Sequence, residues 1–291
     1  MSQTLLVTGA GGALGRLVID NLLAAHAGKI IAGSRDPAKL TDFAAKGVEL
    51  RKVDFDDPAL AESFVGVDRL LIISTDALDV PGHRLRQHEA AVAAAVKAGV
   101  KHIVYTSMPK PEPGSAIAFA PDHYGSEQAI KASGIGYTIL RNNWYFENLK
   151  MSLPGVLASG QWFTSAGKGK IANLSREDLA VAAAVALAAP FDGHRTLTLT
   201  GAEALTTEEI AATASAVFAK PIAVVHLSDE QLAEGLKQHG LPPHMVSFVV
   251  SFDANTRLGG VAEVTDDFTN LTGRTLMTLR DYFAAHKAEY L

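Results

Sequence analysis

The sequence predicts an α/β protein, with a Rossmann-type doubly wound parallel sheet and a small C-terminal substrate lobe. Three observations predict this fold class. Short runs of aliphatic and β-branched residues alternate with longer runs rich in Ala and Leu along the first half, as in βαβ units. The almost continuous apolar run Leu70–Ile73 is typical of a strand covered on both faces. A glycine-rich turn joins the first strand to the first helix.

The strands are predicted where apolar runs are bounded by turn residues. They are Leu5–Thr8, Lys29–Gly33, Glu49–Val53, Arg69–Ser74, His102–Ser107 and Tyr137–Arg141. The helices between them are predicted over Leu14–Ala25, Pro37–Ala45, Asp57–Phe64, His83–Ala98 and Asp122–Ser133. Each helix provides one crossover, so the strands should lie parallel in one sheet.

The second half of the chain is less regular. We predict a helix at Arg176–Leu187, a strand at Arg195–Thr200 and a last helix at about Thr278–Ala288. Thr206-x-x-Glu209 and Ser228-x-x-Gln231 match capping boxes that open helices. We therefore expect a nucleotide-binding domain over residues 1–150, which also uses about 171–201, and a substrate-binding lobe over 151–291.

Composition excludes several classes of function. The 291 residues carry a net charge of −5 and no cysteine, so neither a basic nucleic-acid surface nor a thiolate chemistry is expected. No apolar run is long enough to span a membrane, and no signal peptide is visible, so we expect a cytoplasmic protein. The ten histidines are scattered without metal-ligand spacing, and no metal site is predicted. The oligomeric state stays open.

The glycine turn is the strongest local motif. Gly9-x-x-Gly12-x-x-Gly15 lies between an apolar strand and a helix. Glycines allow a tight turn and let main-chain N–H groups approach a pyrophosphate, which the helix N-terminus also attracts. We therefore predict dinucleotide binding by Gly9, Gly11, Gly12, Ala13, Leu14 and Gly15.

The residues that follow the second strand favour NADPH over NADH. Proteins that bind NAD place an acid near this position for the ribose hydroxyl, whereas this chain has Arg35, whose guanidinium can pair with a 2′-phosphate. Lys39 would add a second charge. Asp36 has two interpretations: it holds the ribose of NADH, or it caps the helix that starts at Pro37, and capping is favoured.

Topology adds further cofactor candidates at strand ends. Asp54 and Phe55 follow the third strand and would lie beside the adenine. Ser74 and Thr75 end the fourth, where hydroxyls can reach a phosphate or ribose. The alternative in each case is an ordinary loop or strand-end residue.

In several segments the sequence resembles the NmrA-like branch of the atypical short-chain dehydrogenases. The resemblance rests on Thr-Gly-Ala-x-Gly-x-x-Gly at 8–15, Ser-Arg-Asp-Pro-Ala-Lys at 34–39, and residues 140–148. Gly167–Ala172, Arg176-x-Asp178-x-Ala180 and Leu271–Arg274 match as well. Within this branch the chain is most similar to bacterial NADPH:quinone oxidoreductases and triphenylmethane dye reductases.

The resemblance implies that the nicotinamide lies at the carboxyl edge of the strands. Thr106 and Ser107 would border it, as would Asn142, Asn143, Trp144 and Tyr145. The alternative for the aromatic residues is packing at a domain junction. The lobe that follows would shape a substrate cavity.

One departure from the wider superfamily concerns its Tyr-x-x-x-Lys pair. Here Tyr124 is followed four residues later by Gln128, which cannot lower the tyrosine pKa. Hydride addition to a quinone needs less help, because water can protonate the product. His123, with an ordinary pKa near ~6.5, and Tyr124 are the proton-donor candidates; a surface or helix-capping role is the alternative for His123.

We therefore expect an NADPH-dependent oxidoreductase that transfers hydride to a quinone-like conjugated acceptor. A reductase of azo or triphenylmethane dyes would differ only in its acceptor. An alternative of another class is a catalytically silent sensor of the NADP(H)/NAD(H) ratio that binds a regulatory partner. The absence of the Tyr/Lys pair is compatible with a quinone or dye reductase and also with a sensor.

Overall fold

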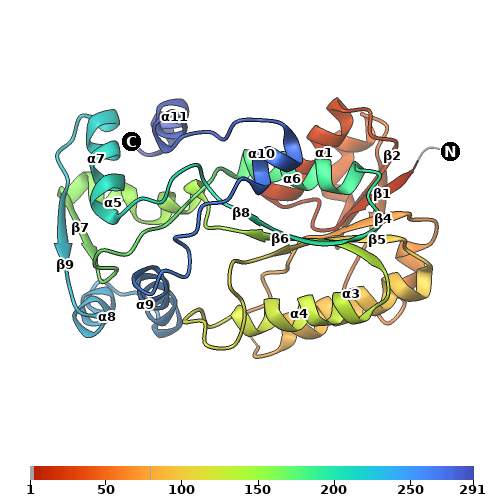
Figure 1. Cartoon of the computed structure of the whole chain (residues 1–291), viewed down its shortest axis with the longest axis horizontal. Helices are drawn as coiled ribbons and strands as arrows, with labels where there is room; N and C mark the ends of the chain where they lie inside the picture. Colours follow the sequence, from red (N-terminus) through yellow and green to blue (C-terminus); the bar gives the residue numbers. More distant parts are fainter. Residues whose placement is uncertain (1–2, 79) are drawn as a thin grey trace.

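The computed structural model describes residues 3–78 and 80–291, and a seven-stranded sheet lies at the centre of this part of the chain (Figure 1). Its strands are β1 (Thr4–Val7), β2 (Lys29–Ser34), β3 (Glu49–Lys52), β4 (Arg69–Ile72), β5 (His102–Ser107), β6 (Gly136–Asn142) and β8 (His194–Leu199). The spatial order is β3-β2-β1-β4-β5-β6-β8, and every neighbouring pair is parallel. This confirms the predicted doubly wound parallel sheet.

Helices cover both faces of the sheet. In Figure 1, α1 (Ala13–Ala24), α6 (Arg176–Ala188) and α10 (Asp267–Thr272) lie on one side, and α3 (His83–Ala98) and α4 (Ala120–Ala132) lie on the other. Each side has its own apolar core, which explains why every residue of β4 and β5 is buried. In the described ranges, none of the helices combines the length and the apolarity that crossing a bilayer requires.

Two predicted helices are more tightly wound than expected, and the second is also shorter. The segment after β2 is a 3₁₀ turn, η1 (Pro37–Leu40), followed by the four-residue α2 (Thr41–Ala44). The helix predicted from Asp57 is only a 3₁₀ turn, η2 (Leu60–Phe64). Asp57 explains the late start, because its side chain accepts a hydrogen bond from the N–H of Ala59 (2.8 Å) and so forms a local turn instead.

The second half builds a group of elements beyond the edge of the sheet, at the left of Figure 1. They are η3 (Phe146–Met151), α5 (Leu153–Ser159), β7 (Gln161–Thr164), α7 (Thr207–Phe218), β9 (Ala223–His226), α8 (Asp229–Gln238), α9 (Pro243–Arg257), α11 (Leu279–Ala285) and η4 (Lys287–Glu289). Both predicted capping boxes form, at the starts of α7 and α8. The parallel pair of β7 and β9 and the helix α9 were not predicted.

Candidate functional site

The glycine turn lies where the strand order reverses. β1 is flanked by β2 and β4, from which the sheet grows in opposite directions. The N–H of Ala10 donates to the carbonyl of Gly33 in β2 (3.0 Å), and the hydroxyl of Thr8 accepts from the N–H of Ile73 directly after β4 (3.0 Å). The turn is thus fixed to both neighbours. Open α/β sheets bind their ligands at such a switch point.

The turn and the start of α1 have the features that a pyrophosphate requires. Gly9 has a φ of 61°, which glycine adopts without strain. Gly9, Gly11, Gly12 and Ala13 are exposed. At the N-cap of α1, Gly12 offers no side chain, and the first turn of the helix has no acid. The first N–H groups and the positive end of the helix dipole therefore face outward without a local anion, so these residues fit a dinucleotide phosphate.

The buried members of the turn act through packing. Leu14 belongs to the core beneath α1, so only its main chain can serve a ligand. A Cβ on Gly15 would lie 2.4 Å from the carbonyl oxygen of Gly9, a separation that packed atoms do not tolerate. Gly15 therefore lets the helix approach the turn closely.

Arg35 lies next to the glycine turn. The hydroxyl of the preceding residue, Ser34, lies 3.8 Å from the position of a Cβ on Gly11. Arg35 is exposed, and within residues 3–78 and 80–291 it makes no ion pair, whereas Lys39 lies 3.3 Å from the Asp36 carboxylate. An exposed arginine that follows Ser34, whose hydroxyl lies near the glycine turn, is compatible with binding of a 2′-phosphate.

The favoured interpretation of Asp36 is wrong. Its side chain makes no capping hydrogen bond to η1, and its backbone (φ −127°, ψ 85°) is outside the usual conformation of an N-cap residue. The hydroxyl of Ser34 accepts a bond from the N–H of Asp36 (3.2 Å), which fixes this backbone in a separate turn. The Asp36 carboxylate pairs with Lys39 instead.

Asp54 and Phe55 follow β3 at the same edge of the sheet. Asp54 accepts a hydrogen bond from the N–H of Asp56 (3.1 Å), so part of its carboxylate is used within the loop. The ring of Phe55 packs into the core on the α3 side of the sheet. Contact with the adenine stays a prediction, and for Phe55 it would involve main-chain atoms.

The hydroxyl-bearing residues at the ends of β4 and β5 are bonded to one another. The N–H of Ser74 donates to the hydroxyl of Thr106 (2.9 Å), and that hydroxyl donates to the Ser74 hydroxyl (3.3 Å). The N–H of Thr75 donates to Nε2 of His88 (3.0 Å). Thr106 is buried, whereas Ser74 and Thr75 are half-buried. Ser74 and Thr75 thus remain the cofactor candidates of this group with some exposure.

Of the next three predicted residues, Ser107 and Asn143 have side-chain hydrogen-bond partners for their donors, whereas Asn142 has a side-chain acceptor without one among the described residues. Ser107 donates to Glu127 (2.8 Å), and the Asn143 amide donates to the carbonyl of Val261 (3.0 Å). Both side chains are therefore occupied. Asn142 is 7% exposed, and its Oδ1 has no hydrogen-bond partner in the described part of the chain. A buried acceptor without a donor is costly, so Asn142 is the amide here that can receive a ligand.

An aromatic cluster covers this edge of the sheet. We define it as Phe119, Trp144, Phe248 and Phe252. The rings of Trp144 and Phe252 have centroids 4.0 Å apart, those of Phe248 and Phe252 4.7 Å, and those of Phe119 and Phe248 5.9 Å. Three of these rings were missed from the sequence, although the four-residue spacing of the two α9 phenylalanines was a signal of a shared helix face.

Tyr145 follows Trp144 in the sequence but has its own contact, with Arg176. The Arg176 guanidinium lies over its ring, 5.3 Å from the centroid. Burial raises the pKa of the Tyr145 hydroxyl, so it stays protonated at neutral pH. Both Trp144 and Tyr145 thus have the packing contacts that their alternative interpretation expected, and their part in nicotinamide binding stays a prediction.

His123 does not have the environment that the sequence suggested. It is 4% exposed, so it is neither a surface nor a helix-capping residue. Its Nε2 lies 3.0 Å from Nη2 of Arg84, and its Nδ1 lies 2.9 Å from the hydroxyl of Tyr105. Burial and the Arg84 charge lower its pKa well below the ordinary value of 6.5, so the assumed pKa was wrong. Tyr124, half-buried on the same helix, stays a prediction.

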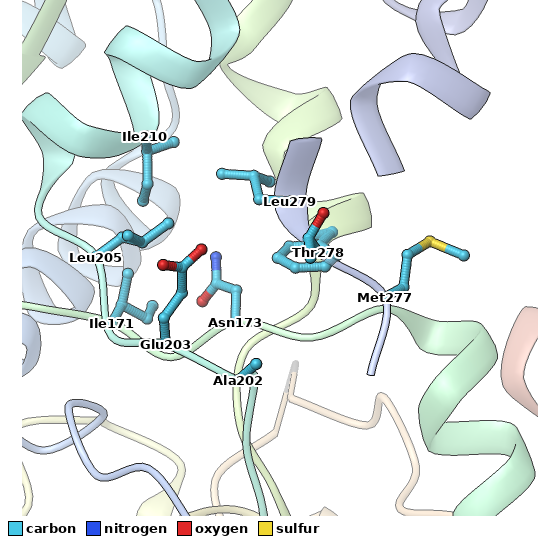
Figure 2. Close-up of a pocket in the computed structure, with 10 residues that line it drawn as sticks. Ile171, Asn173, Ala202, Glu203, Leu205, Ile210, Met277, Thr278 and Leu279 are labelled. Carbon is cyan, nitrogen blue, oxygen red and sulfur yellow. The ribbon is translucent and has the colours of Figure 1, made fainter. Parts of the chain in front are cut away.

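A small cavity in the C-terminal half is a separate feature (Figure 2). Its volume is about 20 Å³, which holds about one water molecule. It is lined by Phe146, Ile171, Asn173, Ala202, Glu203, Leu205, Ile210, Met277, Thr278 and Leu279. Oδ1 of Asn173 is buried there without a partner among the described residues. The cavity is too small for a dinucleotide, and it contains none of the predicted site residues.

The fold and the glycine turn at its switch point define a protein of the Rossmann type that binds dinucleotides. The sequence comparison assigns it more narrowly. Residues 1–282 match the model of the NmrA-like family, and the chain belongs to this family.

Three comparisons show which known proteins this chain is similar to. Quinone oxidoreductase 2 of Escherichia coli (strain K12) is 35% identical over 94% of this chain and 96% of its own. The crystal structure of an Escherichia coli NADPH-dependent quinone oxidoreductase complexed with NADPH has a TM-score of 0.91 and 34% identity, covering 98% of this chain and 99% of that one. The Citrobacter sp. triphenylmethane reductase complexed with NADP(H) has a TM-score of 0.88 and 34% identity, covering 95% and 98%.

Proposed function

We propose that this protein is an NADPH-dependent oxidoreductase that transfers hydride to a quinone-like aromatic acceptor. The observation that carries the proposal is the exposed glycine turn at the switch point of the sheet, with Arg35 beside it. Relatives that cover nearly the whole chain include a quinone oxidoreductase and an azoreductase of Xenophilus azovorans, which supports redox chemistry on conjugated acceptors.

The residues have distinct roles in this proposal. The N–H groups at the start of α1 bind the pyrophosphate, and Arg35 binds the 2′-phosphate of NADPH. Asn142 offers its Oδ1, which has no partner in the described part of the chain, at the edge where the nicotinamide is expected. When bound, NADPH supplies the hydride, and the protein supplies position and electrostatics.

The aromatic cluster is proposed to hold the acceptor. Flat conjugated molecules stack on aromatic rings, and Trp144 lies two residues beyond Asn142 at the end of β6. The cluster also excludes water, which strengthens electrostatic interactions at the acceptor. We do not assign the proton to His123, because burial keeps its imidazole neutral; solvent water supplies it after transfer.

Turnover with a panel of acceptors tests the proposal. We expect NADPH absorbance to fall when a naphthoquinone is added and to stay constant without an acceptor. Tight NADPH binding with no turnover on quinones, azo dyes or triphenylmethane dyes would favour the sensor alternative.

A further inference from the structure

Arg84 is buried, and no counter-ion pairs with it within residues 3–78 and 80–291. It is the second residue of α3 and is 6% exposed. Its Nε and Nη1 are buried and have no hydrogen-bond partner in residues 3–78 and 80–291. Within the same ranges no carboxylate lies within ion-pair distance of it, and Asp76 and Asp122 attract it only at longer range. A buried guanidinium without an anion is strongly unfavourable, so this charge requires an explanation.

Among the described residues, the side chain of Arg84 makes one hydrogen bond, and its partner is a neutral group. An arginine only donates, so Nε2 of His123 accepts from Nη2 of Arg84, at 3.0 Å. The proton of the neutral imidazole is then on Nδ1, which donates to the Tyr105 hydroxyl, 2.9 Å away. Burial raises the pKa of Tyr105, so it does not ionise. The chain of bonds orients Arg84 but does not neutralise it.

The second histidine of this network is also neutral. Nε2 of His88 accepts from the N–H of Thr75 (3.0 Å), so its proton is on Nδ1, which donates to Ser126 (2.8 Å). The Ser126 hydroxyl in turn donates to the carbonyl of Asp122 (2.6 Å). Burial and the charge of Arg84 lower the pKa of His88 to about 3. The positive charge of this buried group is therefore located on Arg84.

The guanidinium lies against the aromatic cluster. Its Cζ is 5.2 Å from the centre of the Phe119 ring, and that ring stacks on Phe248 at an interplanar angle of 25°. Phe252 joins Phe248 to Trp144 in the same cluster. An acceptor held by these rings would thus be close to a positive charge that forms no ion pair with a carboxylate of the described residues.

We infer that Arg84 selects acceptors that become anions when they receive hydride, and that it disfavours acceptors that arrive as cations. The inference rests on the proposed function and specifies its substrate class. A quinone gains two electrons and one proton from NADPH and becomes a hydroquinone monoanion, which water then protonates; NADPH becomes NADP⁺. A triphenylmethane dye is a cation that the same hydride converts to a neutral product. A fixed guanidinium stabilises the first product and repels the second reactant.

Charge variants test the selection. Arg84→Gln removes the charge and Arg84→Lys keeps it, while Arg86→Gln, an exposed site on the same helix, is the matched control. For each variant kcat/KM is measured with 1,4-naphthoquinone and with crystal violet, and the Kd of NADPH is measured separately. We expect R84Q to lower the quinone-to-dye ratio of kcat/KM by roughly tenfold or more, R84K to restore most of it, and R86Q to leave it unchanged.

Two results with these variants would overturn the inference. One is a quinone-to-dye ratio that is the same in R84Q as in the wild type. The other is a fall in kcat/KM that is equal for both acceptors and follows a loss of NADPH affinity in R84Q, because Arg84 would then serve the cofactor. If wild-type protein binds NADPH but reduces none of the acceptors, the proposed function fails instead.

A spectroscopic measurement is made first on the wild-type protein, and the variants then serve as its controls. 4-Nitrophenol is titrated with pH in the presence of the NADP⁺-bound protein, and its phenolate is followed by absorbance. We expect the bound nitrophenol to have a pKa about one unit or more below its free value, since an opposite charge favours the ionised form. The shift should be absent in R84Q and present in R84K. An unchanged or raised pKa, or no saturable binding, contradicts an anion-selective site at Arg84.

Discussion

Gly9 and Gly15 pack so closely that a methyl group on Gly15 would lie 2.4 Å from the Gly9 carbonyl oxygen. The contact joins the turn after β1 to the first turn of α1. Since Gly9 has a positive φ of 61°, neither side of the contact can shift cheaply. This contact sets the distance between the helix N-terminus and the place where a pyrophosphate would lie.

We predict that Gly15→Ala weakens NADPH binding by tenfold or more and destabilises the fold by about 1–3 kcal/mol, because overpacking moves the turn. Titration calorimetry and urea unfolding measure the two effects. Gly235→Ala is the control, since a Cβ in that helix meets nothing within 4 Å. The control should be neutral or slightly stabilising. Equal behaviour of the two variants would refute the role given to Gly15.

Replacing Arg35 should separate the two nicotinamide coenzymes. We expect Arg35→Ala to weaken NADPH by about 10- to 100-fold, the value of a charge-assisted hydrogen bond, and to change NADH by less than twofold. Lys39→Ala should have a smaller effect, because Lys39 already pairs with Asp36. The dissociation constants of both coenzymes measure this difference. Equal losses of affinity for NADPH and NADH would show that Arg35 does not recognise the 2′-phosphate.

Glu127 should contribute strongly to stability. It is fully buried and accepts from Ser107 (2.8 Å) and twice from Arg141 (2.9 and 2.7 Å). We predict that Glu127→Gln lowers the free energy of unfolding by about 3 kcal/mol, since it breaks a buried pair. Glu112→Gln removes the half-exposed partner of the same arginine and should cost under about 1 kcal/mol. Urea unfolding of both variants measures the two changes in unfolding free energy. Similar decreases in the two variants would contradict the stabilising role given to the buried Glu127.

Buried neutral histidines should make the fold sensitive to acid. Burial lowers the pKa of His102 from 6.5 to about 3, helped by the charges of Arg69 and Arg195. Above pH 6.5 both states are neutral and the histidine has no effect. Between pH 6.5 and about 3 the unfolded chain binds a proton that the folded chain does not, so stability falls as pH falls, by about 1.4 kcal/mol per pH unit.

His102→Gln tests this dependence. The variant should show a smaller decrease in unfolding free energy between pH 6.5 and 4.5 than the wild type does, whatever its stability at pH 7.5. Urea unfolding at the three pH values measures the difference. The same slope in both proteins would show that His102 does not cause the acid sensitivity.

The sheet could be predicted from the sequence because its signals are local. The apolar runs at Leu70–Ile73 and His102–Ser107 are each long enough to identify a strand, and alternation with helices fixes parallel pairing. The turn proposed to bind the phosphates could be predicted for the same reason, since its strand and helix are adjacent in the sequence. The NmrA-like resemblance was confirmed over residues 1–282.

The elements that were missed depend on distant partners. β7 and β9 have four residues each and pair with one another, with Gln161 opposite Ala223. Each strand is too short to show a strand pattern in the sequence by itself. The charge of Arg84 was missed because its isolation depends on what α4 and the cluster place around it. His123 was misjudged for the same reason, because spacing along a helix does not reveal whether burial and a neighbouring arginine lower the pKa of a histidine.

Calorimetric titration of the purified apo-protein with NADPH and with NADH tests the central claim most directly. The account predicts one site per chain for NADPH, with clearly weaker binding of NADH. No heat of binding with either coenzyme, from protein shown to be folded, would contradict it.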